Sequence, residues 1–282
     1  MPLTRLAISP STAAFREAVS AALFDAGAQG LQEDGDALVT VLRDAEANER
    51  LDAFVAAVRN VDPACTVDVS ALPDVDWSQA WRERIGAHDL GALTIVPPWL
   101  AEGRDPARTI VIEPEMAFGT GEHETTRCVV RLMPEVIRDG DVVADLGAGS
   151  AVLAIAAAKL GARRVAAIEM DHDAIANAEA NVAANDVAEH VTVLEGDAAV
   201  LLPLVAPVRV VLANILSSVI TALLPTIGAA VPAGGAAIFS GILVAERDGV
   251  LAALESAGGW TVTRETSEGE WWAVAVERFA DL

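Results

Sequence analysis

The sequence is short of cysteine and has no long apolar run. Its two cysteines, Cys65 and Cys128, stand far apart and without the spacing of metal ligands, so two reduced thiols are expected rather than a disulfide or a zinc site. No apolar run reaches the roughly 20 residues that span a bilayer, and the opening MPLTRLAISP lacks the basic-then-apolar pattern of a secretory signal. These absences favour a soluble cytoplasmic protein.

Basic residues are also scarce. Lys159 is the only lysine, and the chain has 19 basic residues and 41 acidic ones, for a formal net charge of −22. Such a charge repels a nucleic-acid backbone, because nucleic-acid affinity comes largely from Lys and Arg, so no direct nucleic-acid binding is expected. An anionic membrane is disfavoured for the same reason, whereas a lysine-rich protein would be attracted. The acidity could equally serve only to keep an apolar-rich chain soluble.

Residues 1–70 predict a small α+β domain. Strands are expected at 3–8 and 65–72, a hairpin at 30–44 around Asp34 and Gly35, and helices at 48–60 and at 11–27, the last from a Ser11 or Thr12 cap to Gly27. The order β-α-β-β-α-β indicates a ferredoxin-like fold. Residues 71–80 are expected to form a linker, and residues 81–282 a second domain.

The second domain alternates between strands and helices. After strands at 92–99 and 109–114 and a helix at 124–137, strands are expected at 141–147, 163–171, 191–197, 208–215 and 234–242, helices at 150–161, 173–186, 217–231 and 245–258, and a closing hairpin at 260–278. Nearly continuous apolar strands separated by helices indicate a mostly parallel α/β sheet that is covered on both faces and has an antiparallel edge.

Ligands of such sheets bind at the carboxyl ends of the strands, so polar residues at these ends are the candidates for binding and catalysis. The first end reads Asp145-Leu146-Gly147-Ala148-Gly149, and its glycines allow close approach to a ligand at the following helix. A dinucleotide fingerprint needs a third glycine at 152, where Val152 stands, and a Walker loop needs an adjacent lysine. Both kinds of phosphate site are therefore poorly supported.

The next strand ends carry further polar groups. Glu169 follows the glycine loop by about 20 residues, the spacing of a carboxylate that binds both ribose hydroxyls. Without a pyrophosphate site, a nucleoside that carries no phosphate fits better, which points to S-adenosylmethionine. Asp197 would approach the adenine edge, and Asn214 ends the fourth strand. Each acidic residue alone could be a solvated strand end or a helix cap, but four such ends in series weaken that alternative.

Residues 113–127, EPEMAFGTGEHETTR, contain a possible metal motif. His123-Glu124-Thr125-Thr126-Arg127 begins like the zinc-protease motif His-Glu-x-x-His, but Arg127 occupies the position of the second histidine. A zinc hydrolase is therefore disfavoured, and no metal site is expected. The two threonines could also simply cap the helix that follows.

Several of these motifs together resemble one family. EPEMAFGTGEHETTR, DLGAGSAVLAIAAAKLGARRVAAIEMD, VVLANIL, SGIL and GEW occur in this order, and they resemble the bacterial methyltransferases of large-subunit ribosomal protein L11 (the PrmA family). The resemblance covers residues 77–282, and the N-terminal segment agrees more loosely. It implies a class I, Rossmann-like methyltransferase domain with a seven-stranded sheet, and a small N-terminal domain that recognises the ribosomal protein. The implied activity is methyl transfer from S-adenosylmethionine to lysine side chains and the N-terminal amine.

The resemblance also implies which residues form the site. Cofactor contacts carry over to Thr126, Gly147, Glu169 and Asn214, and the loop residues Phe118, Gly119 and Thr120 would line the site beside them. Asp145, Gly149 and Asp197 complete the expected cofactor-binding set. For catalysis, the hypothesis is that the Asn214 side chain and nearby backbone carbonyls hold the amine, with no dedicated general base.

Three positions depart from the family pattern, and two alternative functions remain open. The family usually has glycine at positions 115 and 151 and aspartate at 169, where this chain has Glu115, Ala151 and Glu169. One alternative is a methyltransferase of the same fold that acts on another protein lysine or a small molecule. The other is a non-catalytic nucleoside-binding sensor, although Asn214 and the FGTGEHETT segment argue against it.

Overall fold

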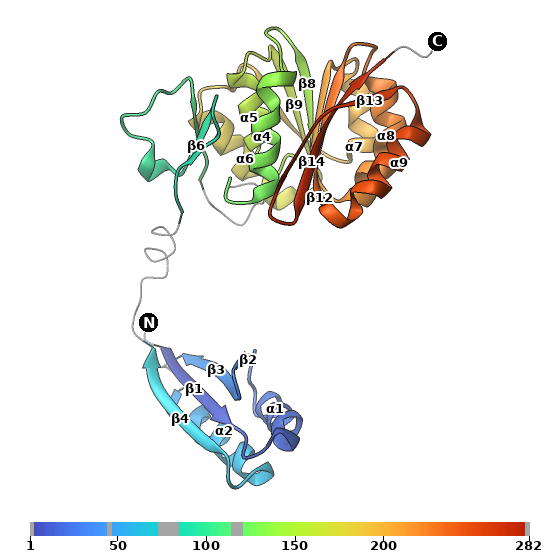
Figure 1. Cartoon of the computed structure of the whole chain (residues 1–282). Coiled ribbons are helices and arrows are strands. Elements are labelled where there is room, and N and C mark those ends of the chain that lie inside the picture. The colour runs from blue at the N-terminus through green and yellow to red at the C-terminus, as the bar shows by residue number, and fades with distance from the viewer. Residues whose placement is uncertain (1–2, 44–46, 73–84, 114–120, 280–282) are drawn as a thin grey trace. The chain divides into compact units, whose positions relative to one another are not determined.

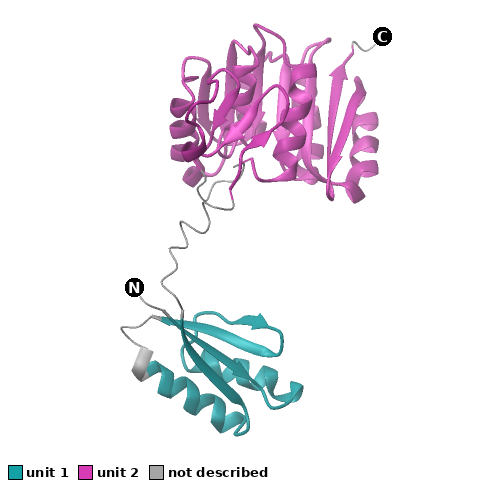
Figure 2. Cartoon of the chain, turned by 60° about the vertical axis from the view of Figure 1, so that its left-hand side comes forward, with its two compact units in different colours: residues 1–84 teal, residues 85–282 magenta. Residues whose placement is uncertain are grey.

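The computed structural model describes residues 3–43, 47–72, 85–113 and 121–279. The chain divides into two compact units, Met1–Arg84 and Ile85–Leu282, each of which is described by itself (Figure 2). Among the helices of the described residues, none combines the length and the apolar character needed to cross a membrane.

The first unit has the element order expected from its sequence. Its described elements are β1 (Leu3–Ser9), α1 (Arg16–Asp25), β2 (Gln32–Asp34), β3 (Ala37–Arg43), α2 (Ala47–Val61) and β4 (Thr66–Leu72). The four strands form an antiparallel sheet in the order β2-β3-β1-β4. Apolar side chains of β1, β3 and both helices, including Leu6, Leu23 and Phe54, make its core.

Two local expectations for this unit need correction. The first helix begins at Arg16, after a 3-10 turn at Ala13–Phe15, and Thr12 makes no capping bond. Ser11 instead donates from its backbone N–H and its hydroxyl to Asp62, at 2.6 and 2.7 Å. Because β4 continues to Leu72, a linker that starts at residue 71 begins too early.

The second unit contains the expected seven-stranded sheet. Its order is β10-β9-β8-β11-β12-β14-β13, in which β14 runs antiparallel to both neighbours and the other pairs are parallel. The strands are β8 (Val142–Leu146), β9 (Arg164–Glu169), β10 (Val191–Glu195), β11 (Val210–Asn214), β12 (Ala236–Leu243), β13 (Trp260–Glu268) and β14 (Trp271–Arg278). The chain proceeds outward from β8 to β10 and then returns to β11, so the topology switches between β8 and β11.

Helices cover both faces of this sheet (Figure 1). On one face lie α4 (Glu124–Val136), α5 (Val152–Lys159) and α6 (His172–Ala184), and on the other lie α7 (Ala198–Val205), α8 (Ser217–Ala230) and α9 (Arg247–Ala257). Sequence reasoning missed α7. Its residues AAVLLPLV are apolar all round and include Pro203, so they show no helical period.

A small three-stranded sheet precedes the large one. It consists of β5 (His88–Asp89), β6 (Thr94–Val96) and β7 (Thr109–Val111), in the order β5-β6-β7. The strand predicted at 92–99 stops at Val96 because Pro97 and Pro98 follow, and a 3-10 turn begins there. The two-residue β5 was not predicted.

Candidate active site

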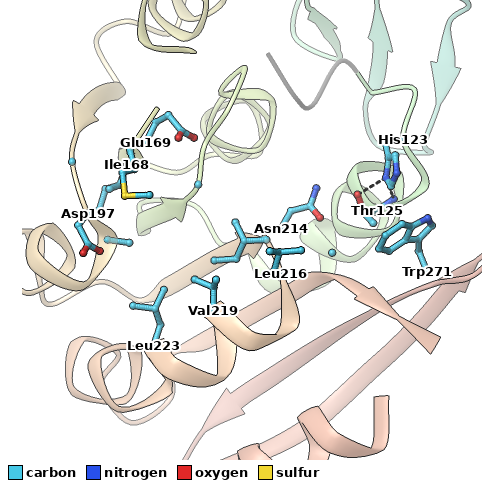
Figure 3. A pocket seen from close by; sticks show the side chains of 16 residues that line it. His123, Thr125, Ile168, Glu169, Asp197, Asn214, Leu216, Val219, Leu223 and Trp271 are labelled. Carbon is cyan, nitrogen blue, oxygen red and sulfur yellow. Dashed lines mark hydrogen bonds between the residues drawn. The ribbon is translucent and has the colours of Figure 1, made fainter. Parts of the chain in front are cut away.

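A cavity of about 520 Å³ opens at the topological switch, at the carboxyl ends of β8, β9 and β11. Figure 3 shows Glu169 and Asp197 at one end, His123, Thr125 and Trp271 at the other, and Asn214 between them. We call these the carboxylate end and the aromatic end. The place is the one that strand topology predicts for a ligand.

At the carboxylate end, backbone groups hold Glu169 in place. Its Oε2 accepts from the Gly149 N–H at 2.7 Å, and its Oε1 accepts from the Asp171 N–H at 2.8 Å. Each carboxylate oxygen can accept more than one hydrogen bond, so the group can also bind ribose hydroxyls in this orientation. Asp197 lines the cavity and also caps α7 through the Ala199 N–H, at 2.8 Å.

At Gly147, the backbone conformation and the packing of the glycine loop allow only glycine. Its φ is +71°, and a β-carbon there would stand 2.4 Å from Cγ2 of Ile215. Ala151, where the family usually has glycine, also has a positive φ of 64°. A left-handed conformation costs a non-glycine residue about 1–2 kcal/mol. This cost is a physical reason for the glycine that the family usually has at position 151, and it is the strain that Ala151 introduces here.

Asp145 lies beneath this loop and not on the cavity wall. It is fully buried, its Oδ2 accepts from the Ala154 N–H at 3.0 Å, and its Oδ1 has no hydrogen-bond partner among the described residues. Burial raises its pKa to about 7, and the nearby Glu169 contributes in the same direction. In this structure Asp145 holds the N-terminal turn of α5, and its expected contact with a cofactor stays a prediction. Gly149 also supports the site indirectly, because its N–H donates to the Glu169 carboxylate.

Asn214 ends β11 in the middle of the cavity. Its Oδ1 is buried and has no partner within the described part of the chain, and its Nδ2 donates to the Thr126 hydroxyl at 3.4 Å. Thr126 is completely buried, and it is Thr125 that lines the cavity. The contact of Thr126 with a cofactor stays a prediction; the partner that the structure shows for its hydroxyl is Asn214.

The aromatic end is built around the start of α4. His123 is the N-cap of α4, so neither threonine caps the helix, and its Nδ1 accepts from the Thr125 N–H at 3.4 Å and lies 2.8 Å from the Thr125 hydroxyl. The ring packs edge-on against Trp271, with centroids 5.0 Å apart.

The arginine that interrupts the zinc motif has a structural partner. Arg127 pairs with Glu268 of β13 at 2.7 Å, and this hydrogen bond lowers the pKa of Glu268. The described residues contain no group of three or more His, Cys, Asp or Glu side chains that could hold a metal ion. Phe118, Gly119, Thr120 and Glu115 lie outside the described residues.

Sequence reasoning did not assign several residues of the cavity wall. His123, Thr125 and Trp271 belong to the quoted motifs, but nothing in their spacing shows that residue 271 meets residue 123. Met170 and Leu216 also line the cavity and are 72% and 69% exposed. Each of the two is an apolar residue just after the end of a strand, Met170 directly after Glu169 and Leu216 directly after Ile215. This position was the signal that could have identified them.

Comparisons with known proteins agree with this geometry. The family model for "Ribosomal protein L11 methyltransferase (PrmA)" matches residues 7–278. A ribosomal protein L11 methyltransferase of Exiguobacterium sibiricum is 37% identical over 223 residues, which cover 77% of this chain and 69% of that protein. One from a Synechococcus species is 38% identical over 211 residues, covering 73% and 70%.

A solved structure is also similar. The crystal structure of a ribosomal protein L11 methylase from Lactobacillus delbrueckii subsp. bulgaricus superposes with a TM-score of 0.61 at 29% identity, covering 69% of this chain and 99% of that one. The match of a family model to nearly the whole chain, with the cavity at the switch point of a class I methyltransferase sheet, establishes the assignment. The chain belongs to the PrmA family of ribosomal protein L11 methyltransferases.

Proposed function

We propose that this protein transfers methyl groups from S-adenosylmethionine to lysine side-chain and N-terminal amines of ribosomal protein L11, in the cytoplasm. The observation that carries the proposal is the buried, unpartnered Oδ1 of Asn214, which lies between the carboxylate end and the aromatic end of one cavity. A buried acceptor without a partner is costly, and an N–H of a bound amine would satisfy it.

The residues at the carboxylate end fit a nucleoside without phosphates. Glu169 offers acceptors to two ribose hydroxyls, and the absence of a side chain at Gly147 leaves room for close approach. The apolar side chains of Met170, Val219 and Leu223 can cover an adenine ring. S-adenosylmethionine would supply a methyl group on a positively charged sulfonium, which suits a chain with a net charge of −22.

The chain's own contribution to transfer is alignment and desolvation. A lysine amine has an ordinary pKa of ~10.4, and the apolar walls at Leu216 and Trp271 would lower it by disfavouring the charged form. Asn214 Oδ1 would then accept an N–H of the neutral amine and direct its lone pair along the cavity. No general-base role is assigned to His123.

Recognition of the ribosomal protein is assigned to the first unit, Met1–Arg84, as part of this proposal, and methyl transfer is assigned to the second unit, Ile85–Leu282. The substrate of the related proteins is named in their descriptions. Crosslinking of the full chain to ribosomal protein L11 should map to the described surface of residues 3–72. Crosslinks confined to residues 85–279 would contradict this assignment.

The central test is transfer of labelled methyl to purified ribosomal protein L11, compared with other lysine-rich proteins. We expect L11 to be labelled at lysines and at its N-terminus, as mass spectrometry would show. Preferential labelling of another protein or of a small molecule would favour the first alternative function. Tight binding of S-adenosylmethionine without transfer to any amine would favour the sensor.

A further inference from the structure

Three asparagines recur at every fourth residue along α6 and its C-cap, and all three are buried. Asn177, Asn181 and Asn185 are 7%, 1% and 5% exposed. Asparagine is a poor helix former, and buried amides require hydrogen-bond partners. One polar stripe on a buried helix face therefore indicates that α6 holds something other than an apolar neighbour.

The last of the three holds the edge of the small sheet. The Val111 N–H donates to Oδ1 of Asn185 at 2.8 Å, and Nδ2 of Asn185 donates to the Val111 carbonyl at 2.6 Å. This is the pair of bonds that a neighbouring strand would make with Val111. The side chain of Asn185 thus takes the place of a strand beside β7.

The middle asparagine connects three segments of the domain. Oδ1 of Asn181 accepts from the Glu113 N–H at 3.0 Å, while its Nδ2 donates to the Ser150 carbonyl and to Asn177 Oδ1, both at 3.1 Å. Ser150 follows Gly149, whose N–H holds the Glu169 carboxylate at 2.7 Å. One fully bonded amide therefore joins the chain after β7, helix α6 and the glycine loop.

We propose that Asn181 is a positioning residue for methyl-donor binding. Its bond to the Ser150 carbonyl fixes the glycine loop, and through Gly149 it fixes the orientation in which Glu169 faces the cavity. The inference rests on the proposed function for the identity of the ligand. Asn177 shares one bond with Asn181 and is also buried, but that bond does not reach the loop, so it is the matched control.

The test compares Asn181→Ala with Asn177→Ala in the full chain, with S-adenosylhomocysteine as the calorimetric probe. Loss of the loop bond is worth about 1 kcal/mol, so Asn181→Ala should bind the probe about fivefold more weakly and raise KM for S-adenosylmethionine in proportion. Its kcat should stay within about twofold, because Asn214 and the aromatic end are untouched. Asn177→Ala should change probe affinity by less than about twofold while losing similar thermal stability.

A second readout does not depend on activity. Hydrogen exchange of the peptide that spans residues 146–152 should be faster in Asn181→Ala than in the unchanged chain and in Asn177→Ala. If Asn181→Ala does not fold, Asn181→Ser takes its place, since a small hydroxyl is easier to accommodate than a void. Equal losses of affinity in the two helix variants, unchanged affinity in Asn181→Ala, or failure of both Asn181 variants to fold would overturn the positioning role. Failure of the unchanged chain to bind the probe would instead contradict the proposed function.

Discussion

The two ends of the cavity are assembled in different ways. The loop and the two carboxylates of the carboxylate end come from residues 147–197, a continuous run of strands and helices in which β8, β9 and β10 are neighbours in the sheet. The aromatic end joins residues 123–125 at the start of α4 to residue 271 at the start of β14, through a sheet order that separates them widely in sequence. The first end depends on local backbone shape, and the second depends on completion of the whole sheet.

The largest effect on activity is expected at Asn214, and measuring it tests to which end of the cavity this residue belongs. Asn214→Ala removes the unpartnered Oδ1, so kcat for methyl transfer should fall about 100-fold or more because the amine loses its alignment. Affinity for S-adenosylhomocysteine should change little. The control is Ser240→Ala, since Ser240 pairs with Asn214 in register but donates to the Thr125 carbonyl. A drop in probe affinity as large as the drop in kcat would place Asn214 at the carboxylate end instead.

The next effect concerns the glycine loop. Gly147→Ala brings a β-carbon to 2.4 Å from Ile215, and relieving such overpacking costs about 2 kcal/mol, so the probe should bind about 30-fold more weakly. Gly140→Ala is a matched control, because Gly140 has a φ of +83° and open space around its β position. Calorimetry on both variants separates the effect of the contact with Ile215 from the effect of placing alanine at a positive φ. Equal losses of affinity in the two variants would show that the contact with Ile215 is unimportant.

A smaller effect is expected at Glu169. Glu169→Gln keeps one acceptor but replaces a charged hydrogen bond by a neutral one, which should weaken probe binding about fivefold. Glu195 lies beside Glu169 in register on β10 and does not line the cavity, so Glu195→Gln should leave the affinity unchanged. Identical affinities for the two variants would remove Glu169 from the ribose contact.

Trp271 tests the aromatic end alone. Trp271→Leu should raise KM for ribosomal protein L11 about threefold, through loss of an aromatic wall beside the bound lysine side chain, and leave probe affinity unchanged. Trp260→Leu provides the control, since Trp260 lies on β13 against Arg278 and not in the cavity. A change in probe affinity without a change in KM for L11 would reverse the assignment of the ends.

The last effect is on stability rather than on binding or rate, and it follows from Asp145. Burial raises its pKa to about 7, so the folded chain keeps a proton that the unfolded chain loses at lower pH. The free energy of unfolding therefore decreases as pH rises toward about 7 and levels off above it. Asp145→Asn has no carboxyl group at this position and does not lose stability in this way as pH rises. Its Tm relative to that of the unchanged chain should therefore rise between pH 5 and pH 8. A Tm difference that is constant with pH would contradict this account.

The contrast between the ends also describes what could be predicted from the sequence. The sheet, its antiparallel edge and the carboxylate end were recognisable, because period, glycine turns and the spacing from Gly147 to Glu169 are local properties. Whether Thr125 or Thr126 lines the cavity depends on how α4 is rotated against β11. The spacing of residues in the sequence does not reveal this rotation. The same holds for the edge contact of His123 with Trp271.

Two other omissions have simple physical reasons. Helix α7 has no polar face to reveal its period, because it is apolar all round. The stripe of Asn177, Asn181 and Asn185 is visible as a recurrence at every fourth residue, but its partners lie on β7 and on the glycine loop. A sequence shows that such a polar face exists and does not show what it binds.

The position of β14 in the sheet has a consequence for the synthesis of the protein. β14 follows every other described strand in the chain, yet it lies between β12 and β13 and pairs with both. Trp271 begins this strand, and Glu268, the partner of Arg127, stands just before it. A nascent chain that has emerged only as far as β12 would already contain the whole carboxylate end, with an open sheet edge and no aromatic end. The aromatic end can therefore form only after the final strand has left the ribosome and inserted.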